Sequence, residues 1–244
     1  MQNYCKTIGA LAAASALVAG NASAEVEYEI HTGYSSMYLF RGQDLGDDLI
    51  EAGVDVAAEF NGLGLSAGAW YGSFLSPSPV PGGFDSNQDE LDIYGEVSKD
   101  LGFVTAAVGY IYYYNPQGFA NKLGNPIDDA QEAYFSIAKS YFGLDMSLTY
   151  FWDIETDNDG YSEFAASKGF ELSPCLTLNT GAILAYFVEE GDLAHLTAKV
   201  SLDWAFTETA TLSPFVAHSW GLGETRNYTS DNELVAGTLL SVSF

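Results

Sequence analysis

The last stretch of the chain, Glu233–Phe244, alternates regularly between two kinds of side chain. Because alternate side chains of a strand point to opposite faces, the stretch is predicted to be a strand with one apolar face. That face carries Leu234, Ala236, Thr238, Leu240, Val242 and Phe244. A barrel that crosses a membrane has to pair its last strand with its first, so that no edge is left open. A final strand of this kind therefore favours a barrel, provided that the rest of the chain supplies the other strands.

Eleven further stretches alternate in the same way, so the sequence predicts an all-β protein. The expected strands cover about residues 26–40, 50–60, 63–75, 90–99, 103–114, 130–141, 144–153, 161–172, 176–187, 193–206, 210–220 and 233–244. Short turns such as Asn61-Gly62 alternate with longer connections such as 76–88. Outer-membrane barrels sort their connections in this way, with tight turns on the periplasmic side. The predicted fold is a transmembrane antiparallel up-and-down β-barrel of about twelve strands.

A cleavable targeting segment precedes the predicted barrel. Lys6, the apolar run 8–20 and the small residues Ala22-Ser23-Ala24 predict a signal peptide over 1–24 and export through the general secretory route. The run is too short to span a bilayer, although a retained anchor helix is the alternative. The barrel then occupies 25–244 and keeps one cysteine, Cys175, so an internal disulfide is excluded.

The barrel is strongly acidic. Removal of residues 1–24 takes away Lys6 and no acid, which leaves 7 basic and 33 acidic residues and a charge of −26. This acidity argues against nucleic acid as a partner. Many acids fall on the inward parity, and rings of carboxylates favour cations. The predicted residues of the lumen or its constriction are Arg41, Glu51, Asp55, Asp92, Glu96, Glu132, Asp145, Glu163, Lys199 and Asp203.

Two expectations concern the ends of the strands. Arg41 is expected beside Asp44, Asp47 and Asp48, where it anchors the first loop or, as the less favoured reading, shapes the constriction. The outward parity predicts anchors at the membrane interfaces, where aromatic rings settle and lysines reach the headgroups. These anchors are Tyr38, Trp152, Lys99, Lys139, Lys168, Trp204 and Phe244.

The connection 153–160 resembles a calcium loop, because acids alternate along it and a glycine follows. The expected ligands are Asp153, Glu155, Asp157 and Asp159. The glutamate that such a loop needs at its twelfth place is replaced by Ala166, so a solvated acidic loop is the favoured interpretation. Weakly bound Ca²⁺ or Mg²⁺ is the alternative, and no other cofactor is expected.

Several short segments resemble the TorF family of porins, exported proteins with little assigned function. The matching segments are Tyr34–Gly42 (YSSMYLFRG), Gln43–Asp48, Gly53–Asp55, Ala67–Trp70, Glu90–Tyr94, Tyr110–Tyr114 and Glu132–Tyr134. The resemblance implies an outer-membrane barrel with a pore, and it implies neither a substrate nor catalytic residues.

The sequence therefore predicts a porin-like channel of the bacterial outer membrane for passive diffusion of small hydrophilic solutes, with a preference for cations. Its expected partners are membrane lipid, lipopolysaccharide and, through the last strand, the barrel-assembly machinery. One alternative is a closed structural or adhesion barrel with acidic cation-binding loops, since twelve strands leave a narrow bore. Another is a hydrolase that uses His31 or His195, but no hydrolase motif surrounds them or His218, so no enzyme is expected.

Overall fold

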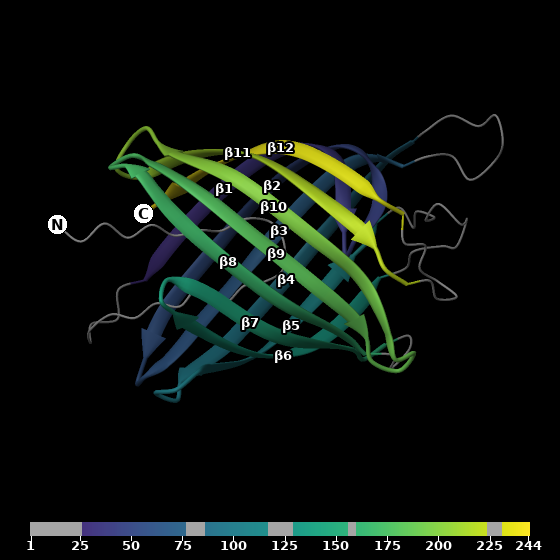
Figure 1. Cartoon of the computed structure of the whole chain (residues 1–244), viewed down its shortest axis with the longest axis horizontal. Helices are drawn as coiled ribbons and strands as arrows, with labels where there is room; N and C mark the ends of the chain where they lie inside the picture. The colour runs from purple at the N-terminus through teal and green to yellow at the C-terminus, as the bar shows by residue number, and fades with distance from the viewer. Residues whose placement is uncertain (1–25, 77–85, 117–128, 156–159, 224–230) are drawn as a thin grey trace.

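The computed structural model describes residues 26–76, 86–116, 129–155, 160–223 and 231–244, which form a closed barrel of twelve antiparallel strands (Figure 1). Each strand pairs with its neighbours in sequence, and the last strand pairs with the first. In order they are β1 (Glu27–Phe40), β2 (Gln43–Phe60), β3 (Leu63–Ser76), β4 (Ser86–Asp100), β5 (Thr105–Tyr114), β6 (Ala130–Tyr141), β7 (Leu144–Asp153), β8 (Tyr161–Ser173), β9 (Leu176–Phe187), β10 (Asp192–Ala205), β11 (Ala210–Gly221) and β12 (Glu233–Ser243). The predicted fold class is confirmed.

The barrel closes between β1 and β12. Their register runs from Glu29↔Ser243 to Ser35↔Gly237, and the Phe244 amide donates to the Tyr28 carbonyl at 2.9 Å. Closure gives the backbone groups of both strands partners on each side, so neither strand is left as an edge. Within the described ranges, no helix is long and apolar enough to cross a membrane.

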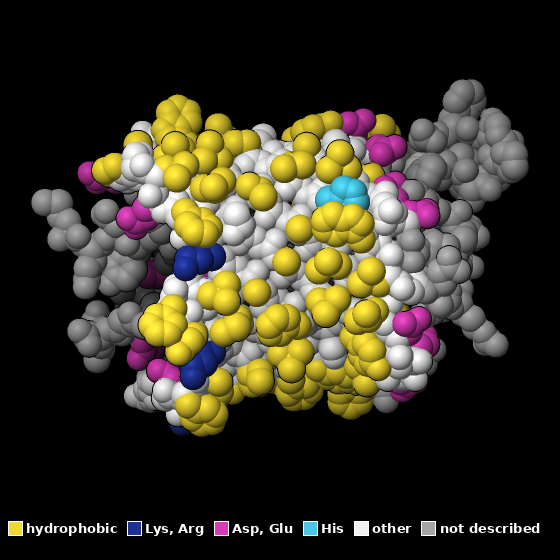
Figure 2. Space-filling view, viewed as in Figure 1, with side chains coloured by type: hydrophobic (Ala, Val, Ile, Leu, Met, Phe, Trp, Pro, Cys, Tyr) yellow, Lys and Arg dark blue, Asp and Glu magenta, His cyan; other side chains and the backbone are white. Residues whose placement is uncertain are grey.

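The outer wall is apolar. Along β7, Leu148 and Trp152 are exposed, whereas Thr149 and Phe151 between them are buried. Figure 2 shows apolar side chains across the middle of the visible face and acidic side chains toward its two ends. Burying such a surface in hydrocarbon removes it from water, so the wall suits a bilayer.

Tight turns connect strands at one end of the barrel. Asn61 and Gly62, between β2 and β3, have φ values of 53° and 72°, and Phe142 and Gly143, between β6 and β7, have 52° and 70°. Two-residue turns with positive φ match the twist of the strands that they join. The end of β12 lies at this same end of the barrel (Figure 1).

Residues 41–49 lie between the first two expected strands, but the structure extends β2 back to Gln43. Phe40 pairs with Gln43 across a two-residue turn in which Arg41 and Gly42 have φ values of 49° and 78°. The pairing is irregular between Tyr38 and Leu39 in β1 and between Asp47 and Ile50 in β2. Asp48, in the second irregularity, has a φ of 54°. Because bulges bend a strand, residues 38–49 turn away from the wall; we call them the inner hairpin.

Tyr38 was predicted to be a membrane anchor, and the structure contradicts this. Its side chain is 7% exposed and forms a cluster with Leu49 and Phe74, against which Leu45 and Trp70 pack. Phe74 and Trp70 lie on the inward face of β3, so the cluster is inside the barrel. The physical reason is the bend, because it carries Tyr38 into the barrel, where parity along the strand no longer separates lipid from lumen.

The other expected anchors lie on the outer surface. Trp152, Trp204 and Phe244 are exposed, as are Lys99 and Lys139, and Lys168 is half-buried. The Lys168 ammonium donates to the Phe142 carbonyl at 3.3 Å, so this side chain reaches toward the end with the tight turns. Contact of these residues with headgroups remains a prediction.

If hydrocarbon covers the outer wall, Leu148→Arg destabilises the barrel by about 2–4 kcal/mol, because Leu148 lies near the middle of β7. The matched control is Leu144→Arg on the same face at the first residue of β7, with an expected cost of about 0–1 kcal/mol. Urea unfolding of the protein folded into lipid vesicles measures both. Equal costs for the two variants would contradict a membrane-embedded wall.

Candidate functional site

The inner hairpin extends across the lumen from its own wall. The Tyr38 ring lies 5.5 Å from Trp70 and 4.9 Å from Phe74 on β3, and its hydroxyl donates to Glu90 on β4 at 2.6 Å. Further along, the Phe40 ring lies 6.0 Å from Tyr113 on β5. The hairpin therefore contacts successive strands of the wall, and its tip carries Arg41 toward β6.

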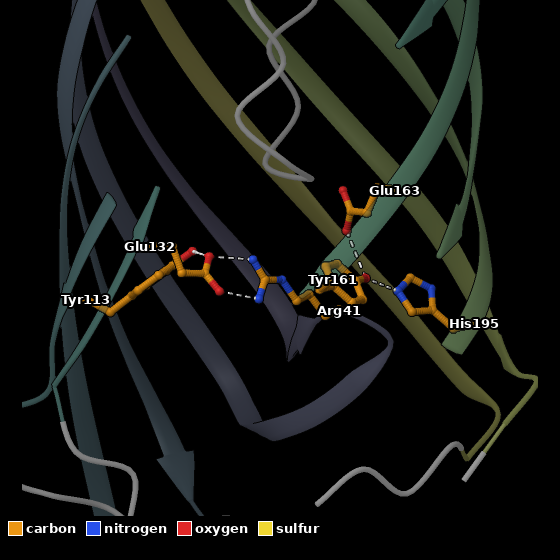
Figure 3. A network of polar contacts seen from close by, with 6 residues as sticks. All are labelled: Arg41, Tyr113, Glu132, Tyr161, Glu163 and His195. Carbon is orange, nitrogen blue, oxygen red and sulfur yellow. Dashed lines mark hydrogen bonds and ion pairs between the residues drawn. The ribbon is translucent and has the colours of Figure 1, made fainter. Parts of the chain in front are cut away.

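Arg41 binds Glu132 on β6 in a bidentate pair (Figure 3). The distances are 2.7 Å from Nη1 to Oε1 and 2.6 Å from Nη2 to Oε2. The Tyr113 hydroxyl also donates to Glu132 Oε2, at 2.9 Å. Two parallel charge-assisted hydrogen bonds fix orientation as well as distance, so this pair holds the tip of the hairpin in one place.

Aromatic rings surround the Arg41 guanidinium. Its central carbon lies 5.0 Å from the ring centre of Phe40, 4.6 Å from that of Phe151 and 4.5 Å from that of Tyr161. The negative faces of such rings attract a cation. Phe151 belongs to β7 and Tyr161 to β8, so the guanidinium touches three consecutive strands of the opposite wall.

The network continues beyond Arg41 toward β11. The Tyr161 hydroxyl donates to Glu163 Oε1 at 3.0 Å and shares a hydrogen bond with His195 Nε2 at 2.8 Å (Figure 3). His195 Nδ1 lies 2.9 Å from the Thr197 hydroxyl, which donates to Ser219 at 2.8 Å. A chain of polar contacts therefore runs through the interior from β5 to β11. Its members satisfy one another, which stiffens the site.

The hairpin and its paired cation stand inside the barrel (Figure 3). Narrowing of a lumen by them stays a prediction. The positive φ of Arg41 is uncommon for a residue with a side chain, and contacts with the wall hold it in place. The bidentate pair with Glu132 fits the reading in which Arg41 anchors the first loop, and a part in the constriction stays a prediction.

Several other predicted lumen acids accept a hydrogen bond from a neighbouring side chain. These contacts are Glu51 with Trp70 (2.7 Å), Asp55 with Tyr94 (2.6 Å), Glu96 with Tyr134 (2.9 Å) and Asp203 with Asn179 (2.7 Å). The Lys199 ammonium lies 4.3 Å from the ring centre of Phe215. Asp92 is half-buried, and Asp145 is exposed beside the turn between β6 and β7. The structure thus unites Arg41, Glu132 and Glu163. It also places Asp92 beside them, as the partner of Tyr113 across β4 and β5.

Sequence reasoning missed part of the network. Tyr113 and Tyr161 were not selected, although both lie on the inward parity of their strands. The contact between Tyr38 and Glu90 was also missed, because the parity of Tyr38 pointed outward. The bidentate partner of Arg41 could not be read from the chain, since Glu132 is 91 positions away.

The acidic connection after β7 is only partly described. Asp157 and Asp159 lie outside the described residues. Asp153 Oδ1 accepts from the Glu155 amide at 2.9 Å, and the Gln131 side chain donates to Glu155 at 3.0 Å. Cation binding by this loop stays a prediction.

A closed barrel of twelve antiparallel strands with an apolar outer wall and charged side chains inside is the fold of outer-membrane porins. The chain is similar to the COG4313 outer-membrane channel from Pseudomonas putida F1, with 9% identity, a TM-score of 0.59 and coverage of 92% of this chain and 97% of that one. It is also similar to the NanC porin (10% identity, TM-score 0.51, coverage 88% and 98%). A third similar structure is the KdgM porin in complex with disordered oligogalacturonate (9% identity, TM-score 0.52, coverage 89% and 99%). No protein-family model matches the chain, and no curated protein matches it. These likenesses define the fold.

If the pair of Arg41 and Glu132 holds the inner hairpin, Arg41→Met destabilises the barrel by about 3–5 kcal/mol, because it leaves a buried carboxylate without its cation. Adding Glu132→Gln should recover part of this loss, so that a double-mutant cycle gives a coupling energy above about 1 kcal/mol. Denaturant unfolding in vesicles provides the four values. The control is Lys168→Met, where an exposed contact is lost and a change within about 0.5 kcal/mol is expected. Additive single variants would show that the pair does not hold the hairpin.

Proposed function

We propose that the protein is an outer-membrane channel for passive diffusion of small hydrophilic solutes and that it prefers cations. The observation that carries the proposal is the sign of the charge inside the barrel. Acids from many strands face the interior, whereas the predicted inward cations are Arg41 and Lys199, and Arg41 is neutralised by Glu132. The fold that the chain shares with porins supports the rest of the proposal.

The remaining interior charge is negative once Arg41 and Glu132 are counted as a neutral pair. Among the predicted lumen residues, Glu51, Asp55, Glu96, Asp145, Glu163 and Asp203 then stand against Lys199. A narrow passage with low-dielectric walls focuses such a field, attracts cations and repels anions. A polyanion such as the oligogalacturonate named with the KdgM porin would therefore be a poor solute here.

The size of the solute is limited by the inner hairpin. It brings Tyr38, Phe40 and Arg41 into the interior, where aromatic side chains of β5, β7 and β8 meet them. Twelve strands leave a narrower bore than the 16–18 strands of open porins, and the hairpin narrows it further. The proposed solutes are accordingly small, and they are cationic or neutral.

The remaining parts of the proposal concern the cell. Residues 1–24 act as an export signal for the general secretory route, and the last strand is read by the barrel-assembly machinery. Lipid and lipopolysaccharide surround the wall, with divalent ions bridging them to the acidic loops. We also propose that the protein belongs to the TorF family of porins, on the basis of segments such as Tyr34–Gly42. We further propose that it has no catalytic activity.

A closed structural or adhesion barrel is the second candidate, and a specific observation favours it. Two buried clusters fill parts of the interior, one around Tyr38 and Phe74 and the other around Tyr134 and Phe151. Packed side chains of this kind exclude water. Conductance separates the two candidates.

Under a KCl gradient across a planar bilayer, the reversal potential of the wild-type channel should show a preference for K⁺, because the interior is acidic. Glu51→Gln combined with Asp203→Asn should lower the K⁺/Cl⁻ permeability ratio. The matched control is Glu208→Gln in the exposed turn after β10, which should leave the ratio unchanged. Preference for Cl⁻ in the wild type would overturn the proposed selectivity.

Release of the inner hairpin should raise conductance. Arg41→Ala combined with Tyr38→Ala removes the bidentate pair and the contact with Glu90, so single-channel conductance is expected to rise roughly twofold. Lys168→Ala, on the outer surface, serves as the control and should conduct like the wild type. If neither the wild type nor the hairpin variant conducts, the closed barrel is the better description.

A further inference from the structure

We propose that Glu29, His31 and Asp55 form a binding site for a divalent transition-metal ion, with Zn²⁺ as the best probe, in the inner wall where the barrel closes. One ligand atom from each residue can be chosen so that all three lie within 4.8 Å of one another. Glu29 and His31 are next-but-one neighbours on the inward face of β1, and Asp55 is the partner of Glu29 on β2. The site goes beyond channel activity and does not depend on it.

The register between β1 and β2 places two acidic residues of this cluster opposite each other. Glu29 and Asp55 stand directly opposite each other on adjacent strands, and two like charges in that position destabilise a sheet. Glu29 is 8% exposed and His31 is 7% exposed, so water does little to screen the repulsion. A bound dication would turn this repulsion into attraction.

The buried histidine points into the cluster. His31 Nδ1 makes no hydrogen bond with the described residues, and neither does Asp55 Oδ2, from which it is separated by 3.4 Å. This distance is at the long end for a charge-assisted pair, whose usual length is about 2.7–2.9 Å. Two buried ligand atoms that face each other without a hydrogen bond are available to coordinate a metal ion.

The surrounding side chains hold the carboxylates in orientation. The Tyr94 hydroxyl donates to Asp55 Oδ1 at 2.6 Å, which leaves Oδ2 facing His31. The Ser243 hydroxyl of β12 donates to Glu29 Oε2 at 3.0 Å. Metal-ligating groups are regularly fixed in this way by hydrogen bonds from outside the cluster.

Two glycines make room for the site. Gly53 stands opposite His31, and a Cβ there would collide with the imidazole ring. A Cβ on Gly68 would lie 2.6 Å from both Asp55 Oδ1 and the Tyr94 ring. The rings of His31 and Tyr94 therefore lie against the wall and are aimed at Asp55 because both neighbours lack a side chain.

The ligand set selects the class of ion. One imidazole nitrogen and two carboxylate oxygens suit Zn²⁺, whereas Mg²⁺ and Ca²⁺ prefer oxygen ligands alone. Tetrahedral zinc with bonds near 2.0–2.1 Å places its ligand atoms about 3.3 Å apart, so the three side chains would close from their present separations of up to 4.8 Å. A fourth position would remain for water or a passing solute.

Calorimetry of the refolded, untagged barrel with ZnCl₂ tests the proposal. The wild type should bind one Zn²⁺, and His31→Gln or Asp55→Asn should weaken binding at least about tenfold, because each removes one of three ligands. The matched controls are His218→Gln, on the outward parity of β11, and Asp203→Asn, an inward acid bonded to Asn179. Both should bind Zn²⁺ like the wild type.

Two further readouts separate a site from general attraction to an acidic lumen. Zn²⁺ should raise the unfolding temperature of the wild type and not that of His31→Gln, since the site ties β1 to β2 and, through Ser243, to β12. X-ray absorption at the zinc edge should show both nitrogen and oxygen neighbours. Absence of Zn²⁺ binding, or binding that His31→Gln leaves unchanged, would overturn the proposal. These results are independent of conductance, so the site and the channel can fail separately.

Discussion

Everything in this structure depends on where the backbone hydrogen bonds go. In hydrocarbon no water can satisfy an amide or a carbonyl, so a wall made of strands has to close on itself. The register between β1 and β12 accomplishes this closure. Because the wall satisfies its own backbone, the outward side chains are free to be apolar and the inward side chains are free to carry charge. Both properties follow from closure.

The inner hairpin differs from the other connections of the barrel. The other connections described in full lie at the ends of the barrel, whereas the strands β1 and β2 continue past the wall and bend inward at two irregularities. The interior then receives a guanidinium, which a low-dielectric space tolerates only beside an opposite charge. Glu132 supplies this charge, and the rings of Phe151 and Tyr161 cover the remaining faces of the guanidinium. The inner hairpin is thus packed and paired within the barrel.

The interior shows two ways of accommodating excess acid. At the tip of the inner hairpin, Glu132 is balanced by Arg41. Near the chain ends, Glu29 and Asp55 face each other beside a histidine, and the proposed ion would supply the missing positive charge. Each arrangement needs a partner from elsewhere in the fold or from solution.

The sequence by itself determined the strands, their faces and the barrel, because side chains alternate with a period of two residues in every strand from β1 to β12. It also placed Glu51, Asp55, Glu96 and Glu132 on the inward parity. Prediction from the sequence failed at Tyr38 and at 41–49. There a positive φ at Asp48 and a tight turn at Arg41 override the alternation of side chains. Tertiary structure alone decided that Arg41 meets Glu132 across the lumen and that His31 points at Asp55. The physical reason is that alternation of apolar and polar residues determines only which side of the sheet a side chain faces. Contacts across a closed barrel depend on the bends and the curvature of its strands, which the alternation does not encode.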